Sequence, residues 1–450
     1  MGFYNLLSSN IIDVAVDSIG TINLSWIGYV IKWIFDLFAG MPGAIALGAV
    51  LFTLALKTIV LPLDIYSRVK MKKQSLLLGS MREDMEKLQK QYANDKQMYN
   101  QKVMELQRAN GYNPLGACLP TLISLAVFMI VFSSFSQYSQ YSNLTSYNNM
   151  TSAYSQAVQE YVLTEDADQN DNGLFLIAAV EDGLNNPVPA GNLKRSEEGK
   201  LVNEQGETVK IYGYFVDYNK FAAYYPSVEG TTEAFPDDWE SLSDVSKNDF
   251  VKNFVRLRAR EAAADYYHAH SAENSFPTAN WWIGNVWYPD SMFNREVPSF
   301  TDFRSAISRA VGNGSIDETY EESYNEVTFN LQNEKNSYNG YFVLIVLAIG
   351  LMFLQQFITM RSQKAANELS TVDGQAATTN KMMMIMMPII FGFFSFMYSA
   401  AFSIYMIVNT TYSLISTLII NKVVSVRFDN ESEKQSLSKA AGRAGRKRLK

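Results

Sequence analysis

The sequence predicts an all-α polytopic membrane protein. We expect a five-helix transmembrane core with a cytoplasmic helical hairpin, and an inserted external α/β or α+β domain between the second and third spans. Five apolar segments approach or exceed the roughly 20 residues that cross a bilayer. Short basic segments separate or follow them, which is typical of loops on the cytoplasmic side. The segment of about 200 residues after the second span is rich in acids, and it is too long for a loop without structure of its own.

The five apolar segments are spaced unevenly along the chain. They are Gly43–Ile65, Leu115–Phe135, Tyr341–Ile358, Met382–Tyr398 and Ala401–Ile420. The last two are separated only by Ser399 and Ala400, which predicts a tight hairpin. Ile22–Phe38 is also apolar, but it carries Lys32 and Asp36 beside two tryptophans. We expect this segment to form an amphipathic helix at the membrane interface, and the alternative is an ordinary sixth span.

The charge of the connecting segments predicts the orientation. Residues 66–113 hold about ten Lys and Arg, the tail after Ile420 holds about nine, and residues 360–381 hold about three. Residues 137–340 hold about 31 acids against about 14 Lys and Arg. Short basic loops stay in the cytoplasm, so we expect the N-terminus outside, the acidic segment outside and the C-terminus in the cytoplasm.

These boundaries divide the chain into ten parts. They are an N-terminal segment with the interfacial helix at 1–42, the first span at 43–65, the cytoplasmic hairpin at 66–113, the second span at 114–136, the external domain at 137–340, the third span at 341–359, a cytoplasmic loop at 360–381, the fourth span at 382–398, the fifth span at 401–421 and a basic cytoplasmic tail at 422–450.

The segments between the spans carry local patterns. Met81–Asn110 repeats apolar residues at helical spacing on either side of Asn94 and Asp95, which predicts two helices joined by a turn. This hairpin is either a solvated spacer or a docking surface for a partner or nascent chain. In the external segment, Leu174–Ile177 and Val209–Val216 favour strands, and Trp239–His268 favours a helix.

The sequence offers no pattern of soluble catalysis. His268 and His270, the two histidines, follow a helical pattern in which their rings diverge, so we expect surface histidines rather than metal ligands. The one cysteine, Cys118, excludes an intramolecular disulfide. Phosphate-binding glycine loops and nucleophile elbows are absent from the sequence. We therefore expect no cofactor, no metal, no DNA partner and no enzyme activity.

Polar residues inside the predicted spans are the main functional clue, because they are costly in lipid. In the first span, Thr53 and Lys57 lie four residues apart and share a helix face. Pro62 removes an amide donor and frees the carbonyl of Thr58. Gln355 and Gln356 interrupt the third span. The polar residues of the fifth span are Ser403, Tyr405, Asn409, Thr410, Thr411 and Ser413.

Together these residues predict a hydrophilic cavity in the membrane, open to the cytoplasm and carrying one positive charge. The alternative for Lys57 is a snorkelling side chain, because it lies about two turns from the cytoplasmic end of its span. The residues themselves leave these two interpretations open.

Several motifs of the chain occur together, and in the same order, in one known family. They are "LKTIVLPLDIYSRVKMKK" in the first span, "NPLGACLPTLISLAVF" from Asn113, "NWWIGNVWYPDS" before the third span, "MFLQQF", and "KMMMIMMPIIFGFFSFMYSAAFSIYMIVNTTYSLIST" over the last two spans. With them the chain resembles the YidC/Oxa/Alb membrane protein insertases over roughly residues 20–136, 280–290 and 341–425.

The resemblance implies a bacterial plasma-membrane protein that inserts nascent membrane proteins into the lipid bilayer without nucleotide hydrolysis. It implies a five-helix core around a groove closed to the outside. The groove's basic residue in the family falls on Lys57, its neighbour on Thr53, and further polar groove positions on Gln356 and Tyr405. Asn409, from the polar face of the fifth span, completes the candidate groove. The resemblance also implies a ribosome contact for the basic tail and a Sec-type translocon as a partner.

The chain departs from the family pattern at three places. Lysine replaces the usual arginine at Lys57, which keeps the charge but loses the forked donor. The second span has Ser124-Leu-Ala126 where Gln-x-Pro is common. The fifth span reads Val408-Asn-Thr410, so the family's Asn is displaced or replaced by Thr410. These departures bear on the range of clients. Two rival functions stay open: a transporter or channel, and an external binding domain tethered by its spans.

Overall fold

A computed structural model of the 450-residue chain describes most of the sequence. The described residues are 11–111, 114–162, 175–180, 187–189, 193–196, 201–208, 211–228, 234–276, 282–307, 316–362 and 375–448, without the side chains of some helical and strand residues among them. The chain forms two compact units. The sheet-containing unit comprises Met1–Asn23, Gln140–Ala272 and Arg295–Ser337, and the long-helix unit comprises Leu24–Ser139, Glu273–Asn294 and Tyr338–Lys450.

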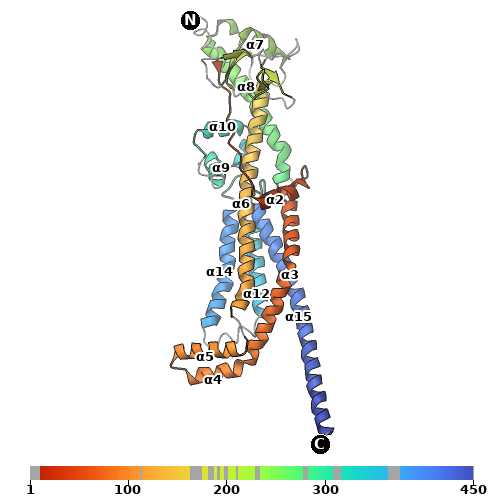
Figure 1. The fold of residues 1–450 in the computed structure, drawn as a ribbon. Helices are drawn as coiled ribbons and strands as arrows, with labels where there is room; N and C mark the ends of the chain where they lie inside the picture. Colours follow the sequence, from red (N-terminus) through yellow and green to blue (C-terminus); the bar gives the residue numbers. More distant parts are fainter. Residues whose placement is uncertain are drawn as a thin grey trace. The chain divides into compact units, whose positions relative to one another are not determined.

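Long α-helices dominate the long-helix unit (Figure 1). They are α2 (Trp26–Asp36), α3 (Ala44–Ser80), α4 (Arg82–Gln91), α5 (Lys96–Ala109), the first part of α6 (Pro114–Gln159), α12 (Val343–Ser362), α14 (Gln375–Met397) and α15 (Ala400–Arg448). Helix α15 packs against both α3 and α12, α12 packs against α14, and α2 packs against α3. The expected hairpin at Ser399 is present, since α14 ends and α15 begins on either side of it.

Aromatic side chains of α6 join it to its neighbours. The ring of Phe128 lies 4.9 Å from that of Phe391 on α14, measured between centroids. The ring of Phe132 lies 5.1 Å from that of Phe402 on α15. On the α3 side, Phe135 contacts Phe52 at 5.5 Å. Each pair is within the distance at which aromatic rings attract each other. Helix α6 therefore packs against α3, α14 and α15.

Three helices of the described part are long and apolar enough to cross a membrane: Ala44–Ser67, Val343–Arg361 and Ala400–Val423. Pro388–Met397 is a shorter apolar helix. These helices coincide with the expected first, third and fifth spans and with part of the fourth. Much of the expected second span has side chains outside the described set. The apolar helices are those of a membrane protein, and the full five-span core stays a prediction.

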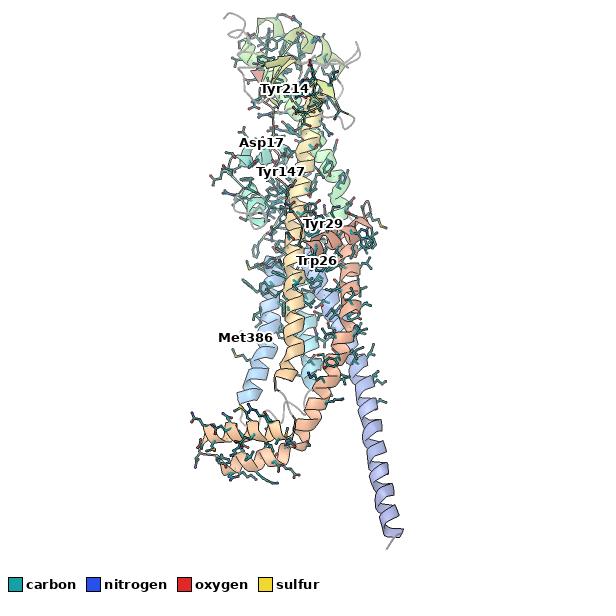
Figure 2. The ribbon with its side chains drawn as sticks, viewed as in Figure 1. Asp17, Trp26, Tyr29, Tyr147, Tyr214 and Met386 are labelled. Carbon is teal, nitrogen blue, oxygen red and sulfur yellow. The ribbon has the colours of Figure 1, made fainter. Side chains whose placement is uncertain are left out.

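Helix α2 is amphipathic, as its sequence predicts. Ser25 caps it by accepting a hydrogen bond from the N–H of Gly28 at 3.2 Å. One face, with Ile31 and Phe35, is buried. On the other face Trp26, which is labelled in Figure 2, is exposed, with an exposed fraction of 76% in the structure. A helix with one buried face and an exposed aromatic face is suited to a membrane interface, and its location there stays a prediction.

Helices α4 and α5 form the expected hairpin. They pack against each other and are joined by a turn over Tyr92–Asp95. The Asp95 side chain caps α5 by accepting the N–H of Met98 at 3.0 Å. Gly111 follows the end of α5 with a φ of +76°. Glycine adopts this left-handed conformation without strain, so it suits the position after a helix. Met85 and Tyr99 are buried, and most other side chains of the hairpin are solvated.

The sheet-containing unit combines an antiparallel sheet with helices, which is an α+β arrangement. The strands are β1 (Ile11–Ile12), β2 (Phe175–Val180), β3 (Pro187–Pro189), β4 (Lys194–Arg195), β5 (Leu201–Val202) and β6 (Ile211–Val216). The main sheet has the order β1-β6-β2-β3, and β4 pairs with β5. The expected strands coincide with β2 and β6. The register pairs Ile11 with Phe215 and Ala178 with Tyr214.

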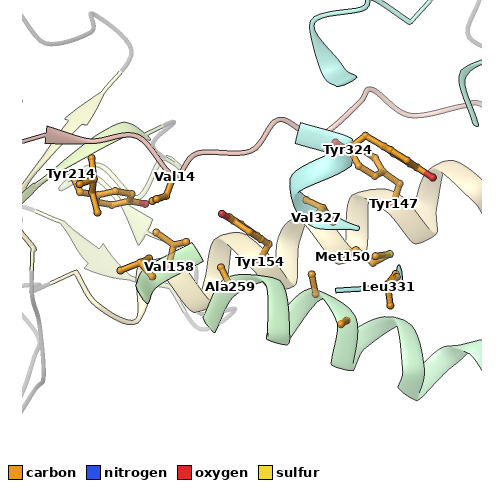
Figure 3. Close-up of a cluster of buried hydrophobic side chains, with 14 of the residues drawn as sticks. Val14, Tyr147, Met150, Tyr154, Val158, Tyr214, Ala259, Tyr324, Val327 and Leu331 are labelled. Carbon is orange, nitrogen blue, oxygen red and sulfur yellow. The ribbon is translucent and has the colours of Figure 1, made fainter. Parts of the chain in front are cut away.

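The helices of this unit supply most of its core. They are the second part of α6, α7 (Tyr218–Tyr224), α8 (Asp244–Asn274), α9 (Phe300–Ile307), α10 (Tyr320–Val327) and α11 (Gln332–Asn336), with 3₁₀ turns at Tyr225–Ser227 and Trp239–Ser241. Tyr147, Met150 and Tyr154 of α6 pack with Tyr324 and Val327 of α10 (Figure 3). Their four-residue and three-residue spacing places them on one face of α6.

The two units do not follow the expected linear boundaries. Residues 1–42 were expected to form one segment, yet β1 joins the sheet while α2 belongs to the long-helix unit. Residues 137–340 were expected to form one inserted domain, yet residues 273–294 belong to the long-helix unit. Hydrogen bonds to residues far along the chain place β1 in the sheet and residues 273–294 in the long-helix unit. Local sequence patterns do not reveal such bonds.

Candidate functional site

Helix α3 carries Thr53 and Lys57 on one face. Thr53 is fully buried, and its hydroxyl donates a 2.6 Å hydrogen bond to the carbonyl of Ala49. Lys57, one turn further along, is half-buried. The neighbouring Thr58 is exposed, and it likewise bonds within its own helix, to the carbonyl of Leu54 at 2.8 Å. The face that contains Thr53 is therefore turned into the protein, and the Lys57 side chain lies at the margin of this buried face.

Helix α15 buries a series of polar side chains. Tyr405 is 2% exposed, and its ring lies 5.5 Å from that of Phe135 and 5.8 Å from that of Phe402. Asn409 is half-buried, and Thr410 is buried. Polar groups that face lipid would lack hydrogen-bond partners. The burial of these residues between helices is consistent with that physical requirement.

Helix α12 carries Gln356, which is half-buried. Because α15 packs against both α3 and α12, the structure brings together the three helices that carry the five predicted groove residues. The residues differ in burial: Thr53 and Tyr405 are enclosed, whereas Lys57, Gln356 and Asn409 are half-buried. Lys57, Gln356 and Asn409 are thus partly covered by protein, while part of each residue stays exposed.

One residue of this unit was missed by the sequence reasoning. Asp290 is fully buried, and its carboxylate accepts the N–H groups of Tyr341, Phe342 and Leu344 at 2.8, 3.0 and 2.7 Å. Burial raises the pKa of the carboxyl, and these backbone donors oppose the rise. Asp290 lies in the "WYPD" motif that carries part of the family resemblance, and that motif was the available signal.

The described residues contain no group of three or more His, Cys, Asp or Glu that could hold a metal ion. His268 pairs with Glu334 at 2.9 Å, and the Nδ1 atom of His270 lies 2.8 Å from the Tyr266 carbonyl. Both histidines thus make protein contacts. Nearby, burial and the charge of Glu334 raise the pKa of Glu296 to about 7. These groups all belong to the sheet-containing unit, whereas the predicted groove residues belong to the long-helix unit.

Comparison with known proteins gives a consistent result. The family described as 60Kd inner membrane protein matches residues 37–181 and 300–427, which is more than half of the chain. A relative from Fusobacterium nucleatum named "Membrane protein insertase YidC" is 39% identical over 90 residues, which are 20% of this chain and 42% of that protein. Proteins of the same name from Francisella philomiragia and Francisella tularensis subsp. novicida are 28% and 29% identical over 130 residues.

Each Francisella match covers 28% of this chain and 23% of the relative, so the chain spans less than half the length of these curated relatives. No solved structure matches the chain. The family match covers both the first long apolar helix and the last two, and it agrees with the resemblance read from the motifs. The chain therefore belongs to the 60Kd inner membrane protein family, which includes YidC-like proteins.

Proposed function

We propose that this protein is a membrane protein insertase, which moves nascent membrane proteins from the cytoplasm into the lipid bilayer. The observation that carries the proposal is the meeting of α3 and α12 on α15, whose polar side chains are buried. The family and the names of the relatives support the same function. As an insertase the protein performs no covalent chemistry and needs no cofactor.

The proposed mechanism uses a hydrophilic groove among these helices. The polar segment of a client enters the groove, where Lys57, Gln356 and Asn409 offer donors and acceptors in place of water. The ammonium group of Lys57 attracts acidic groups of the client. A charged side chain in the middle of a bilayer costs about 3 kcal/mol or more, so this attraction lowers the barrier. The client's apolar helix then moves into lipid, and its burial drives the step without nucleotide.

The orientation and the partners are part of the proposal. The N-terminus and the sheet-containing unit lie outside a bacterial plasma membrane, and the hairpin of α4 and α5 lies in the cytoplasm with the C-terminus. The basic tail at 422–450 contacts the ribosome, and a Sec-type translocon is a partner for larger clients. The charge distribution of the chain supports this orientation, because Lys and Arg gather in the segments assigned to the cytoplasm.

The charge role of Lys57 can be tested by complementation of a strain depleted of the protein. The variants are Lys57→Arg, Lys57→Ala and Lys57→Glu, and the measurement is the insertion of a single-span client with an acidic N-terminal tail. We expect Lys57→Arg to insert normally. Lys57→Glu should slow insertion at least about tenfold, since repulsion exceeding about 1.4 kcal/mol replaces attraction. Lys57→Ala should fall between them.

Two control variants separate this charge effect from damage to the helix. Thr58→Ala changes the next position of α3, where the side chain is exposed and bonds only within its own helix among the contacts described. Lys220→Glu reverses an exposed charge in the sheet-containing unit. Both should insert the client at the normal rate. Normal insertion by Lys57→Glu would refute the charge role, and snorkelling would then explain the lysine.

A further inference from the structure

Residues 282–294, here called the Trp287 segment, form no helix or strand. The segment nevertheless makes hydrogen bonds or ring contacts near the starts of several helices of the long-helix unit. Its carbonyl groups accept the first amides of α15: the N–H of Ala400 donates to Tyr288 at 2.9 Å and that of Ala401 to Val286 at 2.8 Å. The first amides of a helix lack partners within the helix, so the segment supplies them.

The same segment holds the start of α12 through Asp290. Its three accepted hydrogen bonds come from the amides just before and inside the first turn of α12. A helix is usually capped by the residue that precedes it, whereas this carboxylate comes from more than fifty positions earlier. Phe342, which donates one of the bonds, has a φ of +64°, a conformation that a non-glycine residue adopts only when its surroundings hold it.

Asn339 strengthens this attachment. It is fully buried, and its side chain both accepts the N–H of Asn285 at 2.8 Å and donates to the carbonyl of Asn285 at 2.9 Å. It also donates to the carbonyl of Pro289 at 3.0 Å. Asn339, which precedes α12, is thereby hydrogen-bonded to the Trp287 segment both before and after Trp287. The position of α12 thus depends on this segment through several buried hydrogen bonds.

Helices α2 and α6 meet the segment as well. The Ser139 hydroxyl of α6 donates to the Trp287 carbonyl at 3.2 Å. The indole of Trp287 lies 6.0 Å from the Phe35 ring of α2. Phe35 in turn fills the space beside Gly48 near the start of α3. The starts of α3, α12 and α15 are therefore tied, directly or through Phe35, to one short segment.

Because the three helices start near one segment, the predicted groove residues can be compared by their number of positions from each start. Lys57 is the thirteenth residue after the start of α3, and Gln356 is the thirteenth after the start of α12. Thr53 and Asn409 are each the ninth after the starts of α3 and α15. At 1.5 Å per residue, the two sets lie about 20 Å and about 14 Å along their helices. A helix released from the Trp287 segment would lose this alignment.

We propose that Asp290 is a positioning residue that fixes α12 against α15 and so aligns Gln356 with the polar residues of the neighbouring helices. The effect of Asp290 on insertion rests on the proposed insertase function, whereas its effect on the position of α12 does not. Asp290 acts through the backbone of α12 and does not need to touch a client. Its loss should change helix position first and insertion second.

Two spin labels on the full-length protein measure the alignment. In a Cys118→Ser background, labels at Val346→Cys on α12 and Ile419→Cys on α15 use side chains that are 67% and 59% exposed. In lipid nanodiscs, the parent protein should give one narrow distance distribution. Asp290→Ala should broaden or shift it, and hydrogen exchange at Tyr341, Phe342 and Leu344 should rise roughly tenfold or more because a buried acceptor is lost. Asp290→Asn keeps one acceptor oxygen and should fall between the two.

Asp217→Ala is the matched control, because Asp217 caps α7 of the other unit by accepting the N–H groups of Asn219 and Lys220. It should leave the distance distribution and insertion unchanged. An unchanged distribution in folded Asp290→Ala would overturn the positioning role. A changed distance distribution with normal insertion would overturn the claim that this helix position matters for insertion. Should the parent protein insert no client, the proposed function fails, while the spin-label distances still decide the positioning role.

Discussion

Glu326 is a nearly buried carboxylate that joins three helices of the sheet-containing unit. Arg260 of α8 donates to both of its oxygens, at 2.8 and 2.7 Å. The Tyr154 hydroxyl of α6 donates to the same carboxylate at 3.0 Å. The guanidinium of Arg260 also lies 3.8 Å from the centre of the Phe329 ring. A forked arginine–carboxylate pair of this kind has strict geometry, so Glu326 fixes α8 and α6 against α10.

Replacing this one carboxylate should destabilise the unit. Glu326→Gln leaves the Arg260 charge without its partner in a site where Glu326 is 11% and Arg260 19% exposed. We expect a loss of about 2–3 kcal/mol in the free energy of unfolding, below the range for fully buried pairs because some exposure remains. Urea titration of the full-length protein, followed by hydrogen exchange in α8 and α10, measures it.

Glu318→Gln provides the matched control for that prediction. Glu318 pairs with Arg304 at 3.1 Å, but its side chain is 80% exposed. Such a surface pair contributes less than about 1 kcal/mol. Equal losses in the two variants would mean that the Glu326 site is effectively solvated.

At the level of elements, local patterns predicted much of the fold. The helical spacing over residues 81–110 indicated α4 and α5, and Gly111 indicated where α5 ends. The strands β2 and β6 follow their β-branched and aromatic composition. Helix α15, however, runs to Arg448, well beyond the expected fifth span, and no proline interrupts it over that length.

Contacts between distant residues could not be predicted in the same way. The pairing of Ile11 with Phe215 joins positions about 200 residues apart, and no local period encodes it. The role of Asp290 was hidden for the same reason, since its partners begin 51 positions later. For the candidate site, helix faces revealed Thr53 and Lys57 together, but which helices would meet α3 required the tertiary structure.

The contact between α2 and α3 offers a test at this scale. A Cβ at Gly48 would collide with the Phe35 ring, which is 2% exposed and held by Tyr138 and Trp287. Because the ring has little room to move, Gly48→Ala should lower the stability of the long-helix unit by about 1–3 kcal/mol through overpacking. Thermal unfolding of the full-length protein in detergent would show this as a reduced midpoint.

Gly350→Ala is the corresponding control in α12. A Cβ there meets no atom within 4 Å, so this variant should lose no stability, and the higher helix propensity of alanine should raise it by up to about 1 kcal/mol. If Gly48→Ala were as stable as Gly350→Ala, the packing of Phe35 against α3 would be looser than the structure indicates.

Across the whole molecule, the two units interleave along the chain. The core of the sheet-containing unit joins Ile12, Tyr154, Phe254 and Tyr324, which come from all three of its segments. A deletion of residues 147–275 alone would leave the apolar residues of the other two segments exposed. A test of whether this unit is dispensable should therefore remove its three segments together, with short flexible linkers in their place.

The central claim is that the long-helix unit inserts membrane proteins without nucleotide. The most direct measurement places the purified full-length protein in liposomes without ATP or GTP. A single-span client with an acidic N-terminal tail is then diluted from denaturant, and its protease-protected fragment is quantified. We predict a protected fragment well above that in protein-free liposomes, and a smaller amount with Lys57→Glu. A yield no greater than in protein-free liposomes would contradict the claim.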